Sequence, residues 1–584
     1  MGDERTPLAL YLNTHSTGRL AFLCCMLLCL CRLTTCKTMC PSGCSCHDDT
    51  LRVTCIDANL EVVPIQFNPY IEYIDLCNNR IHSVDYTIQN YHKLKHLDLS
   101  RNKIHSLRPH NFELQERLTV LNISYNHITS LSKSTFKGLK SLQVLDISNN
   151  RIEVIHSGAF KETSDLMVLD LSYNKIMSFI DDHIFNNLRK IRIVSLQGNQ
   201  ILEVPSEIFN HIPSSSLEVV RLQENLIEEL HERSFSSSVF SCLKTLNLAS
   251  NVIRTIHRST FSGLHSLVYL DLSDNNLTFI PTEQLSKLSQ LTELDLSTNM
   301  VHEIKPVAFR SLFHLKVLRL SYMQYLSKID SRAFVDNIRL ETVIMDNNPN
   351  LKSIPTRIFH GNHHLLHVSV RGNSLSTLDS SHFPLDRLKS LDLSSNPLIC
   401  NCSLLWLWDL VQQEFRKSFS TVNPVNETFL LPEESQRLRL HLRNLKCDEP
   451  ETLTNVLLLD VPESNVRCET TWLTVAIVTG FVLTLFVITC ILLLLINNDV
   501  SVLNCKKSKD TLESTVGESR HLASNIHGNN GPPPILMLMP GKDSTHADIA
   551  DLSYLEPWVP VKTLDMERLS VGSNARKSPH IVYV

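Results

Sequence analysis

Apolar and polar positions recur along the chain in one fixed pattern. The line L-x-x-L-x-L-x-x-N-x-I/L reads LKHLDLSRNKI at residues 94–104 and LMVLDLSYNKI at residues 166–176. The asparagine position returns every 23 to 26 residues. Fourteen copies place it at Asn79, Asn102, Asn126, Asn150, Asn174, Asn199, Asn225, Asn251, Asn275, Asn299, Met323, Asn348, Asn373 and Asn396. Self-similarity of this kind predicts a repeat array rather than one globular core.

Within each copy the pattern predicts one short strand followed by a turn. Side chains alternate between the two faces of a strand, so the template leucines point inward and the residues between them point outward. A single copy cannot bury its apolar face, but stacked copies bury it together. The asparagine amide can satisfy backbone groups where the chain leaves the strand. The predicted fold class is an α/β repeat solenoid, a leucine-rich-repeat horseshoe with a parallel concave sheet.

A second apolar column follows each asparagine position by about ten residues. Its members are Phe112, Phe136, Phe160, Phe185, Phe209, Phe235, Phe261, Leu285, Phe309, Phe334, Phe359 and Phe383. One aromatic in almost every copy is typical of a packing spine. We interpret the column as the core of the convex side, in preference to a ligand-binding aromatic box.

An apolar run precedes the repeats. Residues 20–30 follow Arg19 and are too short to span a bilayer, which predicts a secretory signal peptide over residues 1–36. A buried helix or an uncleaved anchor is the alternative. A secretory signal implies an oxidising environment in which extracellular cysteines pair.

A longer apolar run follows the repeats. Residues 472–496 carry no charged side chain and are long enough to span a bilayer. Lys506, Lys507 and Lys509 follow closely, so the positive-inside rule assigns residues 497–584 to the cytoplasm. This tail is rich in polar residues, Gly and Pro, and we expect it to be mostly disordered. The chain is thus predicted to be a single-pass type I protein of the plasma membrane, with its N-terminus outside.

Cysteines bracket the repeats. Between the predicted signal peptide and the second apolar run, four precede them in the spacing C-x3-C-x-C-x8-C, and four follow the last copy. These are Cys40, Cys44, Cys46 and Cys55 before the array, and Cys400, Cys402, Cys447 and Cys468 after it. In these residues and in the repeat template the sequence resembles the extracellular leucine-rich-repeat family of Slit, Trk, Toll and their relatives.

That resemblance implies a domain order and a set of disulfide bonds. It implies an N-terminal cysteine cap over residues 37–68, repeats over 69–398 and a C-terminal cysteine cap over 399–468. The implied pairs are Cys40–Cys46, Cys44–Cys55, Cys400–Cys447 and Cys402–Cys468. Arithmetic alone permits three pairings for each set of four. Zinc is the alternative use of such cysteines, and the secretory context disfavours it.

Four features depart from the pattern. Cys77 and Cys242 have no cap partner, and we interpret them as thiols in or near the core rather than as an intermolecular bridge. Met323 replaces an asparagine, and the copies beside it hold one extra residue, which predicts a local bulge. Residues 410–445 exceed the length expected of the cap. We interpret them as a tolerated surface insertion, with a ligand-contacting loop as the alternative.

Outward strand positions supply a candidate ligand face. One column is largely acidic, and the column two residues earlier is apolar in the middle copies. Tyrosines stand at the following turn, and aromatics frequently anchor interfaces. The candidate residues are Asp98, Val120, Tyr125, Asp146, Val144, Asp170, Val168 and Tyr173. An apolar strip beside an acidic one suits a partner with apolar and basic contacts.

Other motifs modify this picture little. Asn-x-Ser/Thr sequences predict glycosylation at Asn122, Asn276, Asn401 and Asn426. The 26 histidines are scattered without H-E-x-x-H or similar spacing, so neither a metal site nor a cofactor is predicted. Without a nucleophile–base pair or phosphate loop, the sequence does not predict an enzyme. A net charge of −5 and no aromatic-rich basic patch argue against nucleic-acid binding.

The C-terminal residues add a candidate partner. Val582, Tyr583 and Val584 could add as a strand to a cytoplasmic PDZ protein. The sequence as a whole predicts a cell-surface receptor or adhesion protein. It would bind an extracellular protein ligand or a homophilic partner on the solenoid and couple through its tail. A structural organiser of the matrix or cell surface is one alternative, and a co-receptor or decoy for another receptor is the second.

Overall fold

A computed structural model describes residues 40–213, 216–235, 238–420, 439–440, 445–467 and 472–506 of the chain. The predicted signal peptide, most of residues 421–444, Cys468 and the tail beyond residue 506 lie outside these residues. The solenoid with its caps forms one compact unit, and a second unit begins at Thr479 within the apolar helix.

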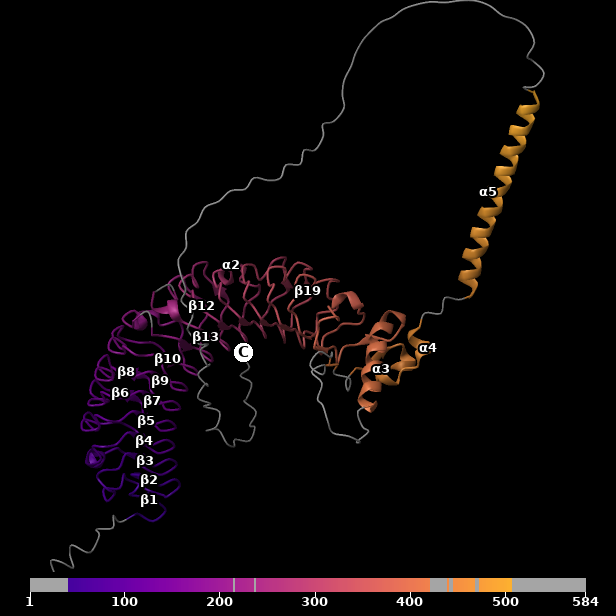
Figure 1. Ribbon diagram of the computed structural model, residues 1–584. Coiled ribbons are helices and arrows are strands. Elements are labelled where there is room, and N and C mark those ends of the chain that lie inside the picture. The colour runs from indigo at the N-terminus through magenta and orange to yellow at the C-terminus, as the bar shows by residue number, and fades with distance from the viewer. Residues whose placement is uncertain are drawn as a thin grey trace, which may run out of the picture. The chain divides into compact units, whose positions relative to one another are not determined.

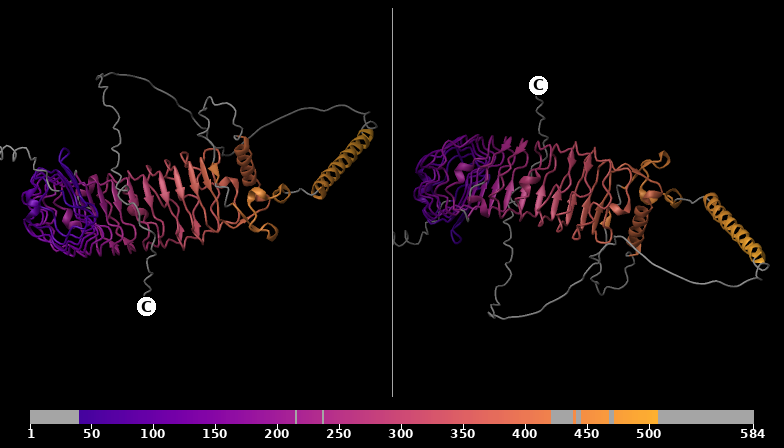
Figure 2. Two further views of the ribbon diagram at one scale, coloured as in Figure 1. Left: turned by 90° about the horizontal axis from the view of Figure 1, so that it is seen from below. Right: turned by 90° about the horizontal axis from the view of Figure 1, so that it is seen from above.

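Fourteen three-residue strands, one per repeat, line the concave side of the solenoid (Figures 1 and 2). They are β3 (Tyr73–Asp75), β4 (His96–Asp98), β5 (Val120–Asn122), β7 (Val144–Asp146), β9 (Val168–Asp170), β10 (Ile193–Ser195), β11 (Val219–Arg221), β13 (Thr245–Asn247), β15 (Tyr269–Asp271), β16 (Glu293–Asp295), β18 (Val317–Arg319), β20 (Thr342–Ile344), β21 (His367–Ser369) and β22 (Ser390–Asp392). Each pairs in parallel with the next, as predicted.

The strand register preserves the template's alternation of inward and outward side chains from one repeat to the next. In β7, Leu145 is fully buried while Val144 and Asp146 on either side are half-buried on the concave face. The same burial pattern recurs from β3 to β22 with few exceptions. Because equivalent residues pair across every strand, each template position becomes a continuous column along the solenoid.

Buried asparagines form a ladder behind the sheet. Asn102 Nδ2 donates to the carbonyl oxygens of Leu76 (2.9 Å), Leu99 (3.0 Å) and Ser100 (3.1 Å). Asn102 Oδ1 accepts the N–H of Ile81 in the preceding repeat at 3.0 Å. One amide therefore satisfies several backbone groups of two repeats, and leaving such groups unpaired would cost about 1–3 kcal/mol each.

The ladder changes at Met323, where the sequence predicts a bulge. Asn348 Oδ1 accepts the N–H of Met323 at 2.8 Å, and Asn373 Oδ1 accepts the N–H of Asn348 at 2.8 Å, whereas the usual donor, such as Ile81, lies two residues after the ladder position. The Nδ2 of Asn348 is buried with no hydrogen-bond partner among the described residues. An added turn closes each of these repeats, since Leu326 N–H donates to Met323 and Leu351 N–H to Asn348. The extra residue is therefore absorbed locally without disturbing strand register.

The convex side consists of turns packed around the phenylalanine column. Phe136 and Phe160 stack at 5.7 Å, as do Phe309 and Phe334, and all four are buried. Short elements mark the connections: β6 (Ser130–Leu131), β8 (Val154–Ile155), β12 (Glu229–Leu230), β14 (Thr255–Ile256), β17 (Glu303–Ile304), β19 (Lys328–Ile329), η1 (Tyr86–Asn90), η2 (Ser206–Phe209), η3 (Ser238–Cys242), α2 (Thr282–Leu285) and η4 (Ser380–His382). Helical content in the described repeats is thus small.

The N-terminal edge of the sheet is closed by a hairpin. β1 (Ser45–His47) pairs antiparallel with β2 (Arg52–Thr54), and β2 pairs in parallel with β3. Disulfide bonds join Cys40 to Cys46 and Cys44 to Cys55. The hairpin therefore covers the strand edge that the first repeat would otherwise expose.

The C-terminal cap contains one longer helix, α3 (Leu405–Ser420), and several short elements. These are β23 (Leu398–Ile399), η5 (Cys402–Leu404), β24 (Arg439–Leu440), β25 (Cys447–Glu449), η8 (Glu451–Leu453), η9 (Leu458–Asp460) and α4 (Glu463–Val466). A disulfide joins Cys400 to Cys447. Cys402 is also disulfide-bonded, and Cys468, its partner in the family pattern, lies outside the described residues.

The interpretation of residues 410–445 as a surface insertion is wrong for their described parts. Val411 on α3 is buried in the core, and Gln412 Nε2 donates to Leu459 O at 2.8 Å. β24 pairs with β22 and extends the concave sheet by one strand. These residues belong to the cap because the last repeat exposes apolar surface and a strand edge that both need cover.

The helix α5 (Trp472–Lys506) follows the cap. Its residues 475–494 have a mean hydropathy of 2.8, enough to cross a membrane by length and composition. None of this stretch is buried in the structure, as expected of lipid-facing side chains.

Candidate functional site on the concave face

The predicted ligand face is assembled from neighbouring strands, as the repeat register requires. Val120, Val144 and Val168 occupy one column across β5, β7 and β9. Asn122, Asp146 and Asp170 occupy the column two residues later. Tyr125 and Tyr173 stand on the turns that follow. The structure therefore brings all of the candidate residues onto one surface, in three parallel columns.

The valine column forms an apolar strip over five adjacent strands. Ile193 of β10 and Val219 of β11 continue it beyond Val168, and all five side chains are half-buried. Parallel strands lie about 4.8 Å apart, so the strip extends about 19 Å along the solenoid. Half-buried aliphatic groups retain apolar area that a partner can still cover.

The N-terminal end of this column is aromatic. The Arg52 guanidinium lies 3.8 Å from the ring centre of Tyr73, and Tyr73 stacks on His96 at 4.4 Å. A cation over an aromatic face and a stacked pair hold these side chains in place. Burial lowers the pKa of His96, which favours the neutral imidazole in this stack.

The acidic column has a structural role that its sequence pattern does not reveal. Asp146 Oδ1 accepts the N–H of Ser148 at 2.9 Å, and Asp98 and Asp170 bind Ser100 and Ser172 in the same way. Each carboxylate thus closes the turn after its strand. Burial, together with the neighbouring Asp170, raises the pKa of Asp146. Asp146 and Asp170 keep their second oxygen for a ligand, whereas that of Asp98 accepts a hydrogen bond from Asn122 Nδ2.

The turn column carries the exposed aromatics. Tyr125 and Tyr173 have relative exposures of 46% and 41%. Both have φ of 53°, the left-handed region that a non-glycine residue rarely adopts. Arg101 lies 4.2 Å over the ring of Tyr125. The unusual backbone conformation directs these side chains out over the neighbouring repeat.

Tyr173 is held by three polar residues of the next two repeats. Its hydroxyl donates to Glu224 Oε1 at 3.1 Å and accepts from Gln197 Nε2 at 2.7 Å. Gln197 also donates to Glu224 and accepts from Gln223 Nε2 at 2.6 Å. Burial and the Glu224 carboxylate raise the pKa of Tyr173 to about 12, so the hydroxyl stays protonated. Gly198 makes room for the ring, since a Cβ there would lie 2.4 Å from Tyr173 Cδ1.

Sequence patterning did not identify this network. Gln197 and Gln223 occupy the position where most copies carry serine, and Glu224 and Gly198 stand in the turn column. The change from L-S-x-N to L-Q-G-N and L-Q-E-N was the available signal. Its meaning depends on contacts 24 to 51 residues apart in sequence, which only the repeat register supplies.

Three of the four glycosylation predictions fall on described residues. Asn122 lies within the ligand face, where its Nδ2 donates to Asp98 Oδ2 at 3.0 Å. Asn276 is half-buried, and Asn401 caps η5 by accepting the N–H of Ser403 at 3.0 Å. Asn426 lies outside the described residues. A glycan on Asn122 would replace a hydrogen bond of the sheet and cover part of the valine strip.

Known families and structures share the repeat architecture. The leucine rich repeat family matches residues 69–126, 116–176, 141–201, 241–301, 289–349 and 338–398. A chain of the Toll–Spatzle complex, a molecular hub in Drosophila development and innate immunity, aligns with 70% of this chain and 63% of its own length. The TM-score is 0.52 at 21% identity, which shows a common fold.

Curated relatives match a smaller segment. The NT-3 growth factor receptor of Homo sapiens is 29% identical over 119 residues, which are 20% of this chain and 14% of the relative. The receptor of the same name from Gallus gallus is 30% identical over 98 residues, 17% of this chain and 11% of the relative. The chain thus spans about a seventh or less of the length of these relatives. With its repeats, asparagine ladder and disulfide-closed ends, it belongs to the leucine-rich-repeat family.

Proposed function

We propose that this protein is a single-pass cell-surface receptor or adhesion protein that binds an extracellular protein on its concave face. The observation that carries the proposal is the apolar strip from Val120 to Val219 beside the fixed side chain of Tyr173. Strip and tyrosine lie on the same face, and the polar network of Tyr173 holds its ring before any ligand arrives. A side chain that is already ordered loses less entropy on binding.

The dimensions of the face favour a protein ligand over a small molecule. A strip of about 19 Å on an open sheet encloses nothing, whereas small-molecule sites are concave pockets that bury most of their ligand. Protein interfaces combine an apolar centre with aromatic anchors and a polar rim. The valines, the tyrosines and the remaining aspartate oxygens supply these three parts in adjacent columns.

The relatives support a protein partner. Toll is described in complex with Spatzle, and the matching curated relatives are named as receptors for a growth factor. We carry over only the kind of interaction, since the matched segments are short or distant in sequence. Binding through the solenoid is the role that the described residues support in this chain.

The proposal includes the membrane and the tail. Residues 475–494 would anchor the chain in the plasma membrane, with the repeats outside. Residues 497–584 would couple ligand binding to cytoplasmic partners, and Val582, Tyr583 and Val584 would engage a PDZ domain. These tail residues lie outside the described part of the chain, so the case for them is the sequence alone.

A binding screen with a matched pair of variants tests the proposal. The ectodomain, residues 37–471, is multimerised for avidity and applied to a library of extracellular proteins that includes itself. Val144→Asp places a charge in the strip and should weaken binding at least tenfold, about 1.4 kcal/mol. Val154→Asp is the control, because Val154 lies on β8 of the same repeat, away from the concave strands, and is 46% exposed.

The outcomes separate the alternatives. Binding to one other protein that Val144→Asp weakens and Val154→Asp does not supports a receptor, and self-binding with the same sensitivity supports homophilic adhesion. If Val144→Asp and Val154→Asp weaken binding equally, the interface does not lie on the concave face. No partner at all would favour the structural organiser. Suppression of another receptor by the soluble ectodomain would favour the co-receptor or decoy.

A further inference from the structure

Two histidines occupy the same repeat position in neighbouring copies. His231 follows β12, and His257 follows β14, which pairs with β12 in parallel. The register aligns Leu230 with Ile256, so the next residues, His231 and His257, also lie side by side. Glu229 stands two residues before His231 and therefore points to the same side of the ribbon.

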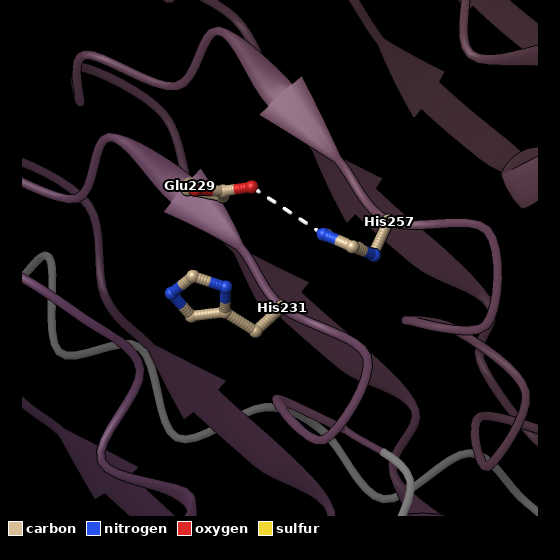
Figure 3. A group of neighbouring side chains, drawn as sticks. All are labelled: Glu229, His231 and His257. Carbon is tan, nitrogen blue, oxygen red and sulfur yellow. Dashed lines mark ion pairs between the residues drawn. The ribbon is translucent and has the colours of Figure 1, made fainter.

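The three side chains converge away from the concave face (Figure 3). His257 Nε2 lies 3.4 Å from Glu229 Oε1, and the two imidazole ring centres are 6.2 Å apart. One ligand atom from each of the three lies within 4.8 Å of the others. Two imidazoles and one carboxylate form a donor set that suits Zn²⁺ and related transition metals.

The backbone beneath this group is fixed. Thr260 is fully buried, and its hydroxyl lies within hydrogen-bonding distance of the carbonyls of Leu230 (3.0 Å) and His231 (3.1 Å). The His257 N–H donates to Leu230 O at 2.9 Å. The Cα positions of the two histidines are therefore set by strand pairing and a buried side chain. Only the outer side-chain torsions remain free to adjust to a ligand.

A fourth residue favours one nitrogen of His257 as the ligand. Glu232 Oε1 lies 3.8 Å from His257 Nδ1, on the opposite side of the ring from Glu229. Metal-binding histidines usually give their second N–H to a carboxylate, which fixes the tautomer and raises the basicity of the ligating nitrogen. A small rotation of the exposed Glu232 side chain would bring its carboxylate within hydrogen-bonding distance of Nδ1, which would leave Nε2 to face Glu229 and His231.

We propose that Glu229, His231 and His257 bind a divalent transition-metal ion, with Zn²⁺ the best fit. Tetrahedral Zn²⁺ with ligands at about 2.0–2.1 Å needs donor atoms about 3.4 Å apart, so small rotations of three exposed or half-exposed side chains close the site. Three protein ligands leave the fourth position for water. His231 and His257 also line an open groove of about 690 Å³, through which the ion can enter.

A simple ion pair is the competing explanation for the cluster. Exposed ion pairs contribute little to stability, so an ion pair alone gives little reason to align two imidazoles. The other such group among the described residues, Asp181, Asp182 and His183, is consecutive in sequence and has a single imidazole. It lacks the paired-strand support of the first cluster.

Metal titration of the purified full-length protein in detergent tests the proposal. The protein carries no polyhistidine tag. Co²⁺ absorption gives the stoichiometry of binding. Competition with a chromophoric chelator gives the Zn²⁺ affinity. We expect one Co²⁺ per chain with a visible absorption band. His231→Ala/His257→Ala should weaken Zn²⁺ binding at least 100-fold, and Glu232→Gln by about 10-fold, the lower end of the usual effect of an orienting partner.

His156→Ala is the matched control. His156 follows β8 at the same repeat position, but the preceding repeat has Ser132 there instead of a ligand, so this variant should bind normally. Circular dichroism establishes that each variant is folded. An unchanged affinity in folded His231→Ala/His257→Ala would overturn the proposal, as would an equal loss in His156→Ala. If Asp182→Asn weakens Zn²⁺ binding and His231→Ala/His257→Ala does not, the ion is bound by the cluster of Asp181, Asp182 and His183, which would also overturn the proposal.

Discussion

At the level of single residues, the turn column combines conformational strain with exposure. All fourteen residues that directly precede the ladder position have φ between 52° and 65°, and only Gly198 and Gly372 among them are glycines. The left-handed region costs a non-glycine residue about 1–2 kcal/mol. The ladder hydrogen bonds offset that cost and fix the direction of each side chain. Residues such as Tyr173 are therefore pre-oriented by the fold rather than by the ligand.

Gly198 has a requirement beyond its backbone angle. Because a Cβ there would clash with the Tyr173 ring, Gly198→Ala should destabilise the protein by about 1–2 kcal/mol in addition to the similar cost of the left-handed backbone, measured by chemical denaturation. Tyr173→Ser removes the clash but not the backbone cost, so Gly198→Ala should cost less in that background. Equal costs in both backgrounds would show that the ring does not pack on Gly198, and the polar network would lose its geometric basis.

The acidic column gives a pH-dependent prediction. Burial raises the pKa of Asp146 in the folded state above its ordinary value of 3.8, so ionisation at neutral pH costs the folded state. Asp146→Asn keeps an oxygen for the Ser148 N–H and removes that cost. The variant should be the more stable protein at pH 7 in thermal denaturation.

Acidification should remove this difference. As the pH falls through the raised folded pKa, the folded carboxyl takes up its proton first and the penalty disappears. Below about pH 3.8, where the unfolded carboxyl is also protonated, the two proteins should differ little. If Asp146→Asn is less stable than the parent at pH 7, the ionised Asp146 carboxylate stabilises the turn after its strand and the prediction is wrong.

At the level of elements, α3 acts as the cover of the last repeat. Trp406 Nε1 donates to Leu378 O at 3.1 Å, and Trp408 Nε1 donates to Val461 O at 2.9 Å. The two indoles thus join the helix to the repeat on one side and to the segment after η9 on the other. The cap is a small core of its own, closed by the Cys400–Cys447 disulfide.

Truncation of one indole tests this role. Trp408→Ala should destabilise the cap by about 3–5 kcal/mol, because it removes a buried aromatic side chain and a hydrogen bond. Hydrogen exchange should then accelerate in α3 and in β22 while the central strands stay protected. Asp409→Ala is the control on the same helix, since Asp409 is exposed. If hydrogen exchange in α3 and β22 is the same in both variants, α3 is a surface insertion rather than part of the cap core.

The sequence predicted the repeats better than the caps or the histidine cluster, for a physical reason. The strands, the asparagine ladder and the phenylalanine column repeat a local pattern in twelve to fourteen copies, so a deviation in one copy does not obscure the pattern. The cap elements α3 and β24 occur once and depend on contacts with the last repeat. His231 and His257 stand 26 residues apart, so no linear motif marks them, and only strand pairing brings them together.

At the level of the whole molecule, the stabilising contacts of the solenoid and the proposed membrane anchor lie in separate parts of the chain. Each repeat contacts its neighbours, so the solenoid is stabilised by nearest-neighbour interfaces and by its two caps. The central side chains of α5 are exposed rather than buried in a core. Substitutions in α5 should therefore change the location of the protein without unfolding the ectodomain.

Charges placed in the centre of α5 test its role as the membrane anchor. Leu485→Arg/Ile488→Arg should cost about 5–7 kcal/mol of insertion free energy, from about 2.5–3.5 kcal/mol for each arginine at the bilayer centre. Cells should then release the folded ectodomain into the medium, where a conformation-sensitive antibody to the repeats detects it. Leu485→Ala/Ile488→Ala keeps the run apolar and should leave the protein on the cell surface.

In the unaltered chain, an epitope after residue 40 should stain intact cells, and one after Val584 should stain only permeabilised cells. The reverse staining pattern would show that the N-terminus is cytoplasmic, and the partner of the concave face would then be a cytoplasmic protein.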